Sequence, residues 1–127
     1  MCDALINSVD LLPTMLDLAG LEPAADLPGR SQADWCRTGR GERQRDVLLE
    51  LLDWRALYDG RWCYALRYRG EEVQPIHLIE AQADPHDLHN LISDPAVEGV
   101  RHKAHDRLIE RLCEAGDREF LSATGLW

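Results

Sequence analysis

Four of the histidines in this 127-residue chain have a spacing that could bind a metal ion. They form two pairs three residues apart, a spacing that places both side chains on one face of a helix. The pairs are His86 with His89 and His102 with His105. Asp84 and Asp87 lie near the first pair, but neither pair has an obvious third ligand, so surface positions are favoured over a transition-metal site. We predict no catalytic, cofactor-binding or metal-binding residue in the chain itself.

The cysteines and serines also lack the context of an activated nucleophile. The sequence contains no Gly-x-Ser-x-Gly elbow, no phosphate-binding loop and no His-Glu-x-x-His motif. The four cysteines are far apart, which favours free thiols in a reducing compartment over a two-disulfide framework. They are Cys2, Cys36, Cys63 and Cys113. Since no basic leader with an apolar run is present either, the sequence favours a cytoplasmic location.

The charge balance bears on the partners that the chain can bind. The sequence has 14 basic and 23 acidic side chains, a formal net charge of −9. Nucleic acids and anionic membranes attract clustered Lys and Arg, so neither is an expected partner. Hydrophobic residues make up 45% of the chain, as in a folded globular domain.

Residues 76–95 are the stretch around which the rest of the chain is organised. A buried strand is predicted for residues 76–79, followed by two turns of helix that each begin at an Asp-Pro dipeptide. Asn90 is predicted to end the first of these turns in a left-handed backbone conformation, beside Leu91. The two dipeptides are Asp84-Pro85 and Asp94-Pro95.

Strands are predicted before this stretch and one helix after it. Residues 46–53 favour a strand, and residues 54–58 and 61–68 flank Asp59-Gly60, a dipeptide typical of a type I′ hairpin turn. Residues 94–114 show the apolar periodicity of a helix that ends near Gly116. The sequence therefore predicts an α+β fold, with an antiparallel sheet of about four strands packed against a C-terminal helix.

A short apolar helix and a loop precede the sheet. Asn7, Ser8 and Asp10 compete for the N-cap of this helix, Pro13 falls in its first turn, and Gly20 ends it. Its apolar residues surround nearly the whole cylinder, and a helix of this kind requires cover on most sides. They are Leu11, Leu12, Met15, Leu16, Leu18 and Ala19. We expect a missing domain or a second copy of the chain to cover Leu11, Leu12, Met15 and Leu16.

Three ordered segments resemble the sulfatase family within the alkaline-phosphatase-like superfamily. Residues 8–21 resemble its Val-Asp-Leu-x-Pro-Thr-Leu-Leu-Asp-Leu-Ala-Gly helix, and residues 28–31 resemble its Gly-x-Ser-Leu element. Residues 76–95 resemble its C-terminal Asp-Pro and Asn-Leu signature, with departures at His77, Glu80 and His89. The matching residues are Asp10, Pro13, Thr14, Gly20, Gly29, Asp84, Pro85, Asn90, Leu91, Asp94 and Pro95.

The resemblance implies that this chain is the C-terminal portion of a sulfatase-like hydrolase. Residues 1–45 would then belong to the catalytic domain, and residues 46–127 to a C-terminal α+β subdomain. The family cleaves sulfuric esters with a formylglycine, made from Cys or Ser in Cys/Ser-x-Pro-x-Arg, beside a divalent cation such as Ca or Mg. No cysteine or serine here lies in that motif, so the chain alone is expected to be inactive. The alternative is a free-standing interaction module that oligomerises through its N-terminal helix.

Overall fold

The computed structural model describes residues 4–70 and 72–123 and divides into two compact units. The first unit extends to Val47 and the second begins at Leu48. The assignment of residues 1–45 to the catalytic domain of a longer protein stays a prediction. Within the described residues, no helix has both the length and the apolar character needed to cross a membrane.

The first unit contains the predicted apolar helix. It has a short 3-10 turn, η1 (Ser8–Asp10), followed directly by α1 (Leu11–Leu18), and then α2 (Ala33–Thr38). Gly20 ends α1 with a φ of 74°, and its N–H donates to the carbonyl of Asp17 at 3.0 Å. The exposed fractions of Leu11, Leu12 and Met15 are 57%, 48% and 59%. The apolar surface that the sequence predicts is therefore left open within this unit.

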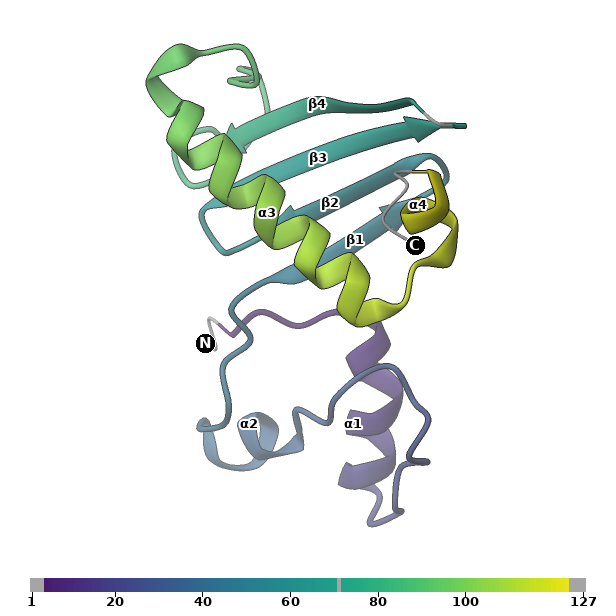
Figure 1. Cartoon of the computed structure of the whole chain (residues 1–127). Helices are drawn as coiled ribbons and strands as arrows, with labels where there is room; N and C mark the ends of the chain where they lie inside the picture. Colours follow the sequence, from purple (N-terminus) through teal and green to yellow (C-terminus); the bar gives the residue numbers. More distant parts are fainter. Residues whose placement is uncertain (1–3, 71, 124–127) are drawn as a thin grey trace. The chain divides into compact units, whose positions relative to one another are not determined.

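The second unit is built on a four-stranded sheet with the strands in chain order (Figure 1). The strands are β1 (Val47–Leu51), β2 (Trp54–Tyr58), β3 (Trp62–Arg69) and β4 (Glu72–Glu80). β3 pairs antiparallel with both β2 and β4. The predicted α+β fold with a small antiparallel sheet is confirmed.

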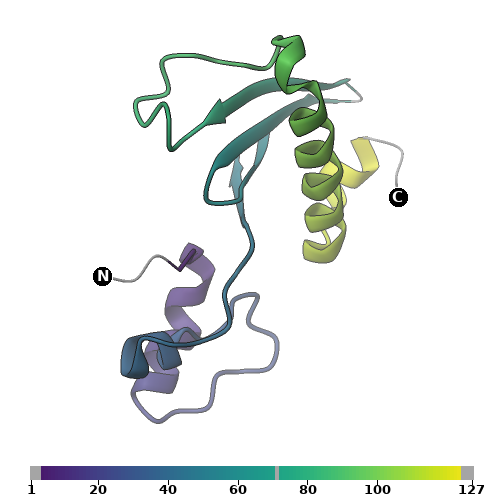
Figure 2. The same cartoon turned by 90° about the vertical axis from the view of Figure 1, so that its left-hand side faces the viewer.

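One face of the sheet carries the helices of this unit. They are η2 (Pro95–Val97), α3 (Glu98–Ala115) and α4 (Arg118–Ala123), and Figure 2 shows α3 and α4 on the same side of the sheet. The core between the two layers consists of Leu57, Tyr64, Leu66, Tyr68, Leu78, Leu108, Leu112, Phe120 and Leu121. Alternation along the strands sends every second side chain to the opposite face, where the described part of this unit has no helix.

The hairpin between β2 and β3 differs from the prediction by one residue. The Asp59 N–H donates to the Trp62 carbonyl at 3.1 Å, so these two residues form the last pair of the hairpin. The central turn residues are therefore Gly60 and Arg61 and not the predicted Asp59 and Gly60. Gly60 has a φ of 92°, and Arg61 is not among the residues with positive φ. Positive φ at the first central position alone is the type II′ pattern, not the predicted type I′. The Asp59 carboxylate favours this turn by accepting from the Arg61 and Trp62 N–H groups.

β4 is longer than the predicted strand. It begins at Glu72 because Pro75 lies on an edge strand, where a missing N–H is tolerated. The pairing register between β3 and β4 shifts between Ala65 and Leu66. Ala65 lies opposite His77 and Leu66 opposite Pro75, so the pairing skips Ile76. Gly70, which precedes this strand, has a φ of 60°, and Glu71 lies outside the described residues.

Candidate functional site

Asp10 is the most buried charged residue in the described part of the first unit, with an exposed fraction of 2%. Its carboxylate accepts hydrogen bonds from the Asn7 N–H at 2.8 Å and the Arg30 N–H at 2.9 Å. The side-chain amide of Gln44 donates to the same carboxylate. Asp10 therefore completes the capping box that Asn7 begins at η1 and also fixes the loop that contains Arg30, which explains physically why an aspartate occupies this position.

Thr14 and Asp17 hold the same loop further along α1. The Thr14 hydroxyl donates to the Asp10 carbonyl at 2.6 Å and accepts from the Gln32 N–H at 2.9 Å. The Ser31 hydroxyl donates to the Asp17 carboxylate at 2.6 Å, which together with Arg37 lowers the pKa of that carboxyl. The two residues thus fix the positions of the loop backbone and of Ser31.

Gly29 lies where this loop passes closest to the helix. A Cβ at this position would lie 2.0 Å from the Val9 carbonyl oxygen, so no other residue fits without moving the backbone. Pro13 is buried within α1. The structure thus brings the motif residues of the first unit together as a brace between α1 and its loop, and it gives none of them the geometry of a nucleophile.

Asp84 organises the loop that follows β4. Its carboxylate accepts from the Leu88 N–H at 2.8 Å and the His89 N–H at 2.7 Å, which lowers its pKa. The chain after Pro85 forms a turn and not the predicted turn of helix. The left-handed residue is Asp87, with a φ of 53°, so the prediction for Asn90 was wrong.

Asn90 uses its side chain instead. Its amide oxygen accepts from the Leu78 N–H at 3.0 Å, and its amide nitrogen donates to the Ile76 carbonyl at 2.8 Å. Leu91 donates its N–H to the Leu78 carbonyl at 2.8 Å, so this short segment continues the pairing at the edge of β4. An asparagine suits this position because one side chain supplies both a donor and an acceptor to a strand edge.

The second Asp-Pro dipeptide starts a helix, as predicted. The Asp94 carboxylate accepts from the Ala96 N–H at 2.8 Å, and Pro95 is the first residue of η2, which leads directly into α3. α3 ends at Gly116, with a φ of 69°. This dipeptide therefore sets the start of the helix that covers the sheet.

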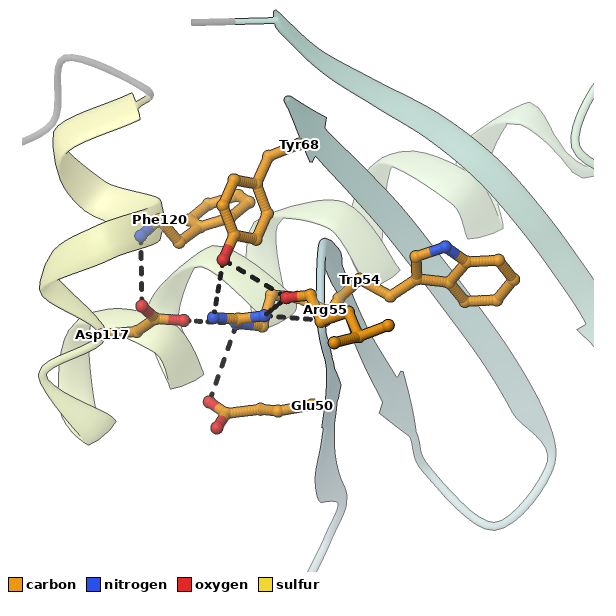
Figure 3. A network of polar contacts seen from close by, with 7 residues as sticks. Glu50, Trp54, Arg55, Tyr68, Asp117 and Phe120 are labelled. Carbon is orange, nitrogen blue, oxygen red and sulfur yellow. Dashed lines mark hydrogen bonds and ion pairs between the residues drawn. The ribbon is translucent and has the colours of Figure 1, made fainter. Parts of the chain in front are cut away.

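A buried ion pair that the sequence analysis missed joins β2 to the C-terminal segment (Figure 3). The side chains of Arg55 and Asp117 are 8% and 9% exposed, and Arg55 donates to the Asp117 carboxylate. Arg55 also donates to the Tyr68 hydroxyl at 3.1 Å and to the Leu52 carbonyl at 3.0 Å. Glu50 adds a longer contact to Arg55 at 3.8 Å.

Asp117 also begins α4. Its carboxylate accepts from the Phe120 N–H at 3.1 Å, and Phe120 is fully buried against Tyr68 in an edge-to-face contact. Burial raises the pKa of the Asp117 carboxyl, but the bonds from Arg55 and from the Phe120 N–H outweigh that effect and the pKa lies below its usual value. The available sequence signal was the position of Arg55 on the inward face of β2, where a charge requires a partner.

The histidines do not come together as metal ligands. His86 and His102 are exposed, and His89 contacts Asp84 at 3.4 Å. His105 is bonded to the hydroxyl of Tyr64, whose pKa burial raises to about 12. Across residues 4–70 and 72–123, no three His, Cys, Asp or Glu side chains are placed to hold a metal ion. The residues present thus do not fit the divalent cation that the sulfatase resemblance implies.

The described cysteines are free thiols, and one of them is sheltered. Cys36 and Cys113 are exposed, whereas Cys63 lies partly buried on β3. Burial raises the pKa of the Cys63 thiol, and the nearby Asp87 and Asp59 raise it further. A thiol of this kind is a poor nucleophile at neutral pH. Cys2 lies outside the described residues.

Comparisons with known proteins agree with the resemblance. The family model described as N-sulphoglucosamine sulphohydrolase, C-terminal, matches residues 1–114. The chain is 26% identical over 94% of its length to the ulvan-active sulfatase of Formosa agariphila, and 28% identical over 91% of its length to the uncharacterized sulfatase YidJ of Escherichia coli. It covers 24% of each of them, about a quarter of their length.

A solved structure of a sulfatase contains the same fold in about a quarter of its chain. BT1596, a 2-O GAG sulfatase, is 25% identical and superposes with a TM-score of 0.71 over 85% of this chain and 25% of its own. The region matched by the family model contains both the helix with Asp10 and the loop with Asn90. The chain belongs to the N-sulphoglucosamine sulphohydrolase C-terminal family of sulfatases.

Proposed function

We propose that this chain is the C-terminal part of a hydrolase that cleaves sulfuric esters, and that it has no activity by itself. One observation carries the proposal. The sulfatase match extends over residues 1–114, yet the chain corresponds to only 24% of its relatives and contains no Cys/Ser-x-Pro-x-Arg sequence. The reacting groups of the parent would then lie in the remaining three quarters.

The formylglycine and the divalent cation, Ca or Mg, would come from that remaining part. When bound, the cation would polarise the sulfate ester. The described residues of this chain offer it no ligand set. Their role is structural, because Asp10, Thr14 and Asp17 brace one loop and Asn90 completes the edge of the sheet.

The exposed face of α1 would contact the catalytic part of the parent. Leu11, Leu12 and Met15 are about half exposed, and Leu18 beside them is 47% exposed. Leu16, the fourth predicted contact residue, is partly covered within the unit. Apolar side chains exposed in this number on one short helix are typical of an interface. We propose that this surface is buried in the full-length protein.

Sulfated polysaccharides are the proposed substrate class of the parent. Of the relatives compared above, one is named for activity on ulvan and one as a GAG sulfatase. Both names point to sulfate esters carried by a sugar chain. We therefore propose that the parent removes sulfate from a polysaccharide or from an oligosaccharide derived from it.

The proposal is tested by measuring sulfate release from 4-nitrocatechol sulfate with added Ca or Mg. The 127-residue chain should release none, whereas the polypeptide translated from the complete reading frame should release sulfate. Turnover by the short chain that follows the protein through purification would contradict the proposal. Sedimentation of the short chain is a second test, because it measures the oligomeric state. A monomer in which α1 is ordered would contradict the proposal that the apolar face of this helix must be buried against another surface.

A further inference from the structure

A tryptophan and an arginine lie side by side on the sheet face opposite α3. Trp54 on β2 pairs directly with Arg67 on β3, and Arg67 pairs with Gln74 on β4. Residues directly opposite each other in antiparallel strands point to the same face, so these three side chains form a row across the sheet. Figure 3 shows Trp54 directed away from the Arg55 network, on the other side of β2.

The guanidinium of Arg67 contacts Trp54 and Asp53, and one of its donors has no hydrogen-bond partner among the described residues. It lies over the indole of Trp54, 5.5 Å from the ring centre. Its Nε is buried and has no hydrogen-bond partner among the described residues, although the Asp53 carboxylate is 3.8 Å away. A ligand from outside cannot reach a buried atom, so it would bond to the part of the Arg67 side chain that is exposed.

Of the two arginines that contact Asp53, Arg67 is the less tightly paired. The Asp53 carboxylate accepts from Arg69 at 3.0 Å, and this bond lowers the pKa of Asp53. Glu72 lies opposite Arg69 in the register, so the acidic groups are concentrated around Arg69. The side chain of Arg67 is 36% exposed and Trp54 is 38% exposed, so both are partly open to solvent.

We propose that Trp54, Arg67 and Gln74 form a binding subsite for a sulfated sugar residue. The planar guanidinium matches the geometry of sulfate oxygens, as it does for carboxylate and phosphate. The apolar face of a sugar ring packs on an indole, and the Gln74 amide can bond to a sugar hydroxyl. The choice of sulfate over other anions rests on the proposed function, whereas the row of side chains does not.

The test is an NMR titration of the isotopically labelled 127-residue chain with sucrose octasulfate, trigalacturonate and sucrose. We expect sucrose octasulfate to shift the Trp54 indole N–H and the amides of Arg67 and Gln74, with about millimolar affinity. Sucrose should cause no such shifts. Shifts of equal size with trigalacturonate would overturn the choice of sulfate, and shifts confined to another surface would overturn the site.

Two variants and a matched control complete the test. Arg67→Gln should weaken binding about tenfold, the effect of losing a charge-assisted hydrogen bond, and Trp54→Ala should weaken it too. Arg61→Gln is the control, because Arg61 also lies over a tryptophan, Trp62, at 5.4 Å, but is bonded to Glu80 at 2.7 Å. Equal losses in Arg61→Gln and Arg67→Gln would overturn the proposal. Because no turnover is needed, this result is independent of whether the parent is a sulfatase.

Discussion

The buried pair between Arg55 and Asp117 gives a sharp prediction about stability. Replacing Asp117 by Asn removes the charge but keeps an amide that can still accept from the Phe120 N–H. Arg55 is then left as a buried cation, 8% exposed, with Glu50 as its only carboxylate contact among the described residues, at 3.8 Å. Breaking a buried ion pair in this way costs about 3 kcal/mol of unfolding free energy.

The pH dependence of this loss follows from the lowered pKa of Asp117. A carboxyl whose folded pKa is depressed contributes stability above its unfolded pKa of about 3.9, and that contribution is lost as the pH falls through the folded pKa. The difference between wild type and Asp117→Asn should therefore be constant above about pH 5 and shrink below about pH 4.

A double-mutant cycle separates the pair from its surroundings. Arg55→Met, Asp117→Asn and the double variant are unfolded in urea while the amide signal of Leu66, fully buried on β3, is followed by NMR. This signal reports the second unit alone. We expect a coupling energy of about 2 kcal/mol, because the second substitution removes the charge that the first left unpaired. A coupling below about 0.5 kcal/mol would refute the reasoning.

Three further predictions concern the brace, the edge of the sheet and the sheltered thiol. Gly29→Ala should destabilise the first unit by about 2 kcal/mol or more, because the added Cβ meets the backbone of Val9. Gly99→Ala adds its Cβ to open space and should stabilise α3 by up to about 1 kcal/mol. Thermal melts measure the change in stability of both variants. Asn90→Ala should cost about 1–2 kcal/mol and speed hydrogen exchange at the Leu78 amide, and unchanged exchange would contradict its role. Iodoacetamide should alkylate Cys63 more slowly than the two exposed described cysteines, which mass spectrometry can follow.

The elements that the sequence predicted well are those with a local signal. The apolar periodicity that ends at Leu112 and the glycine at position 116 located α3, and Asp94 located the start of η2, which leads into α3. The Asp59-Gly60 dipeptide predicted the end of β2 correctly and the start of β3 to within one residue. In each case the periodicity or the cap is fixed by residues only a few positions apart, so a sequence can reveal it.

The features that were missed depend on contacts between distant residues. Arg55 and Asp117 are 62 positions apart, and Asp117 lies beyond residue 114, where the family match ends. Asn90 was expected to contribute through its backbone, yet its side chain bonds to β4 because a strand edge leaves groups unpaired there. The hairpin turn lies one residue later than predicted because the Asp59 carboxylate accepts from the N–H groups of Arg61 and Trp62.

The central proposal, that the reaction centre of the parent hydrolase lies outside these 127 residues, is tested most directly by sequencing the genomic DNA upstream of the codon for Met1. We predict an open reading frame that continues upstream without a stop codon and encodes Cys or Ser followed by x-Pro-x-Arg. A stop codon with a ribosome-binding site immediately before Met1 would contradict the claim and favour a free-standing module.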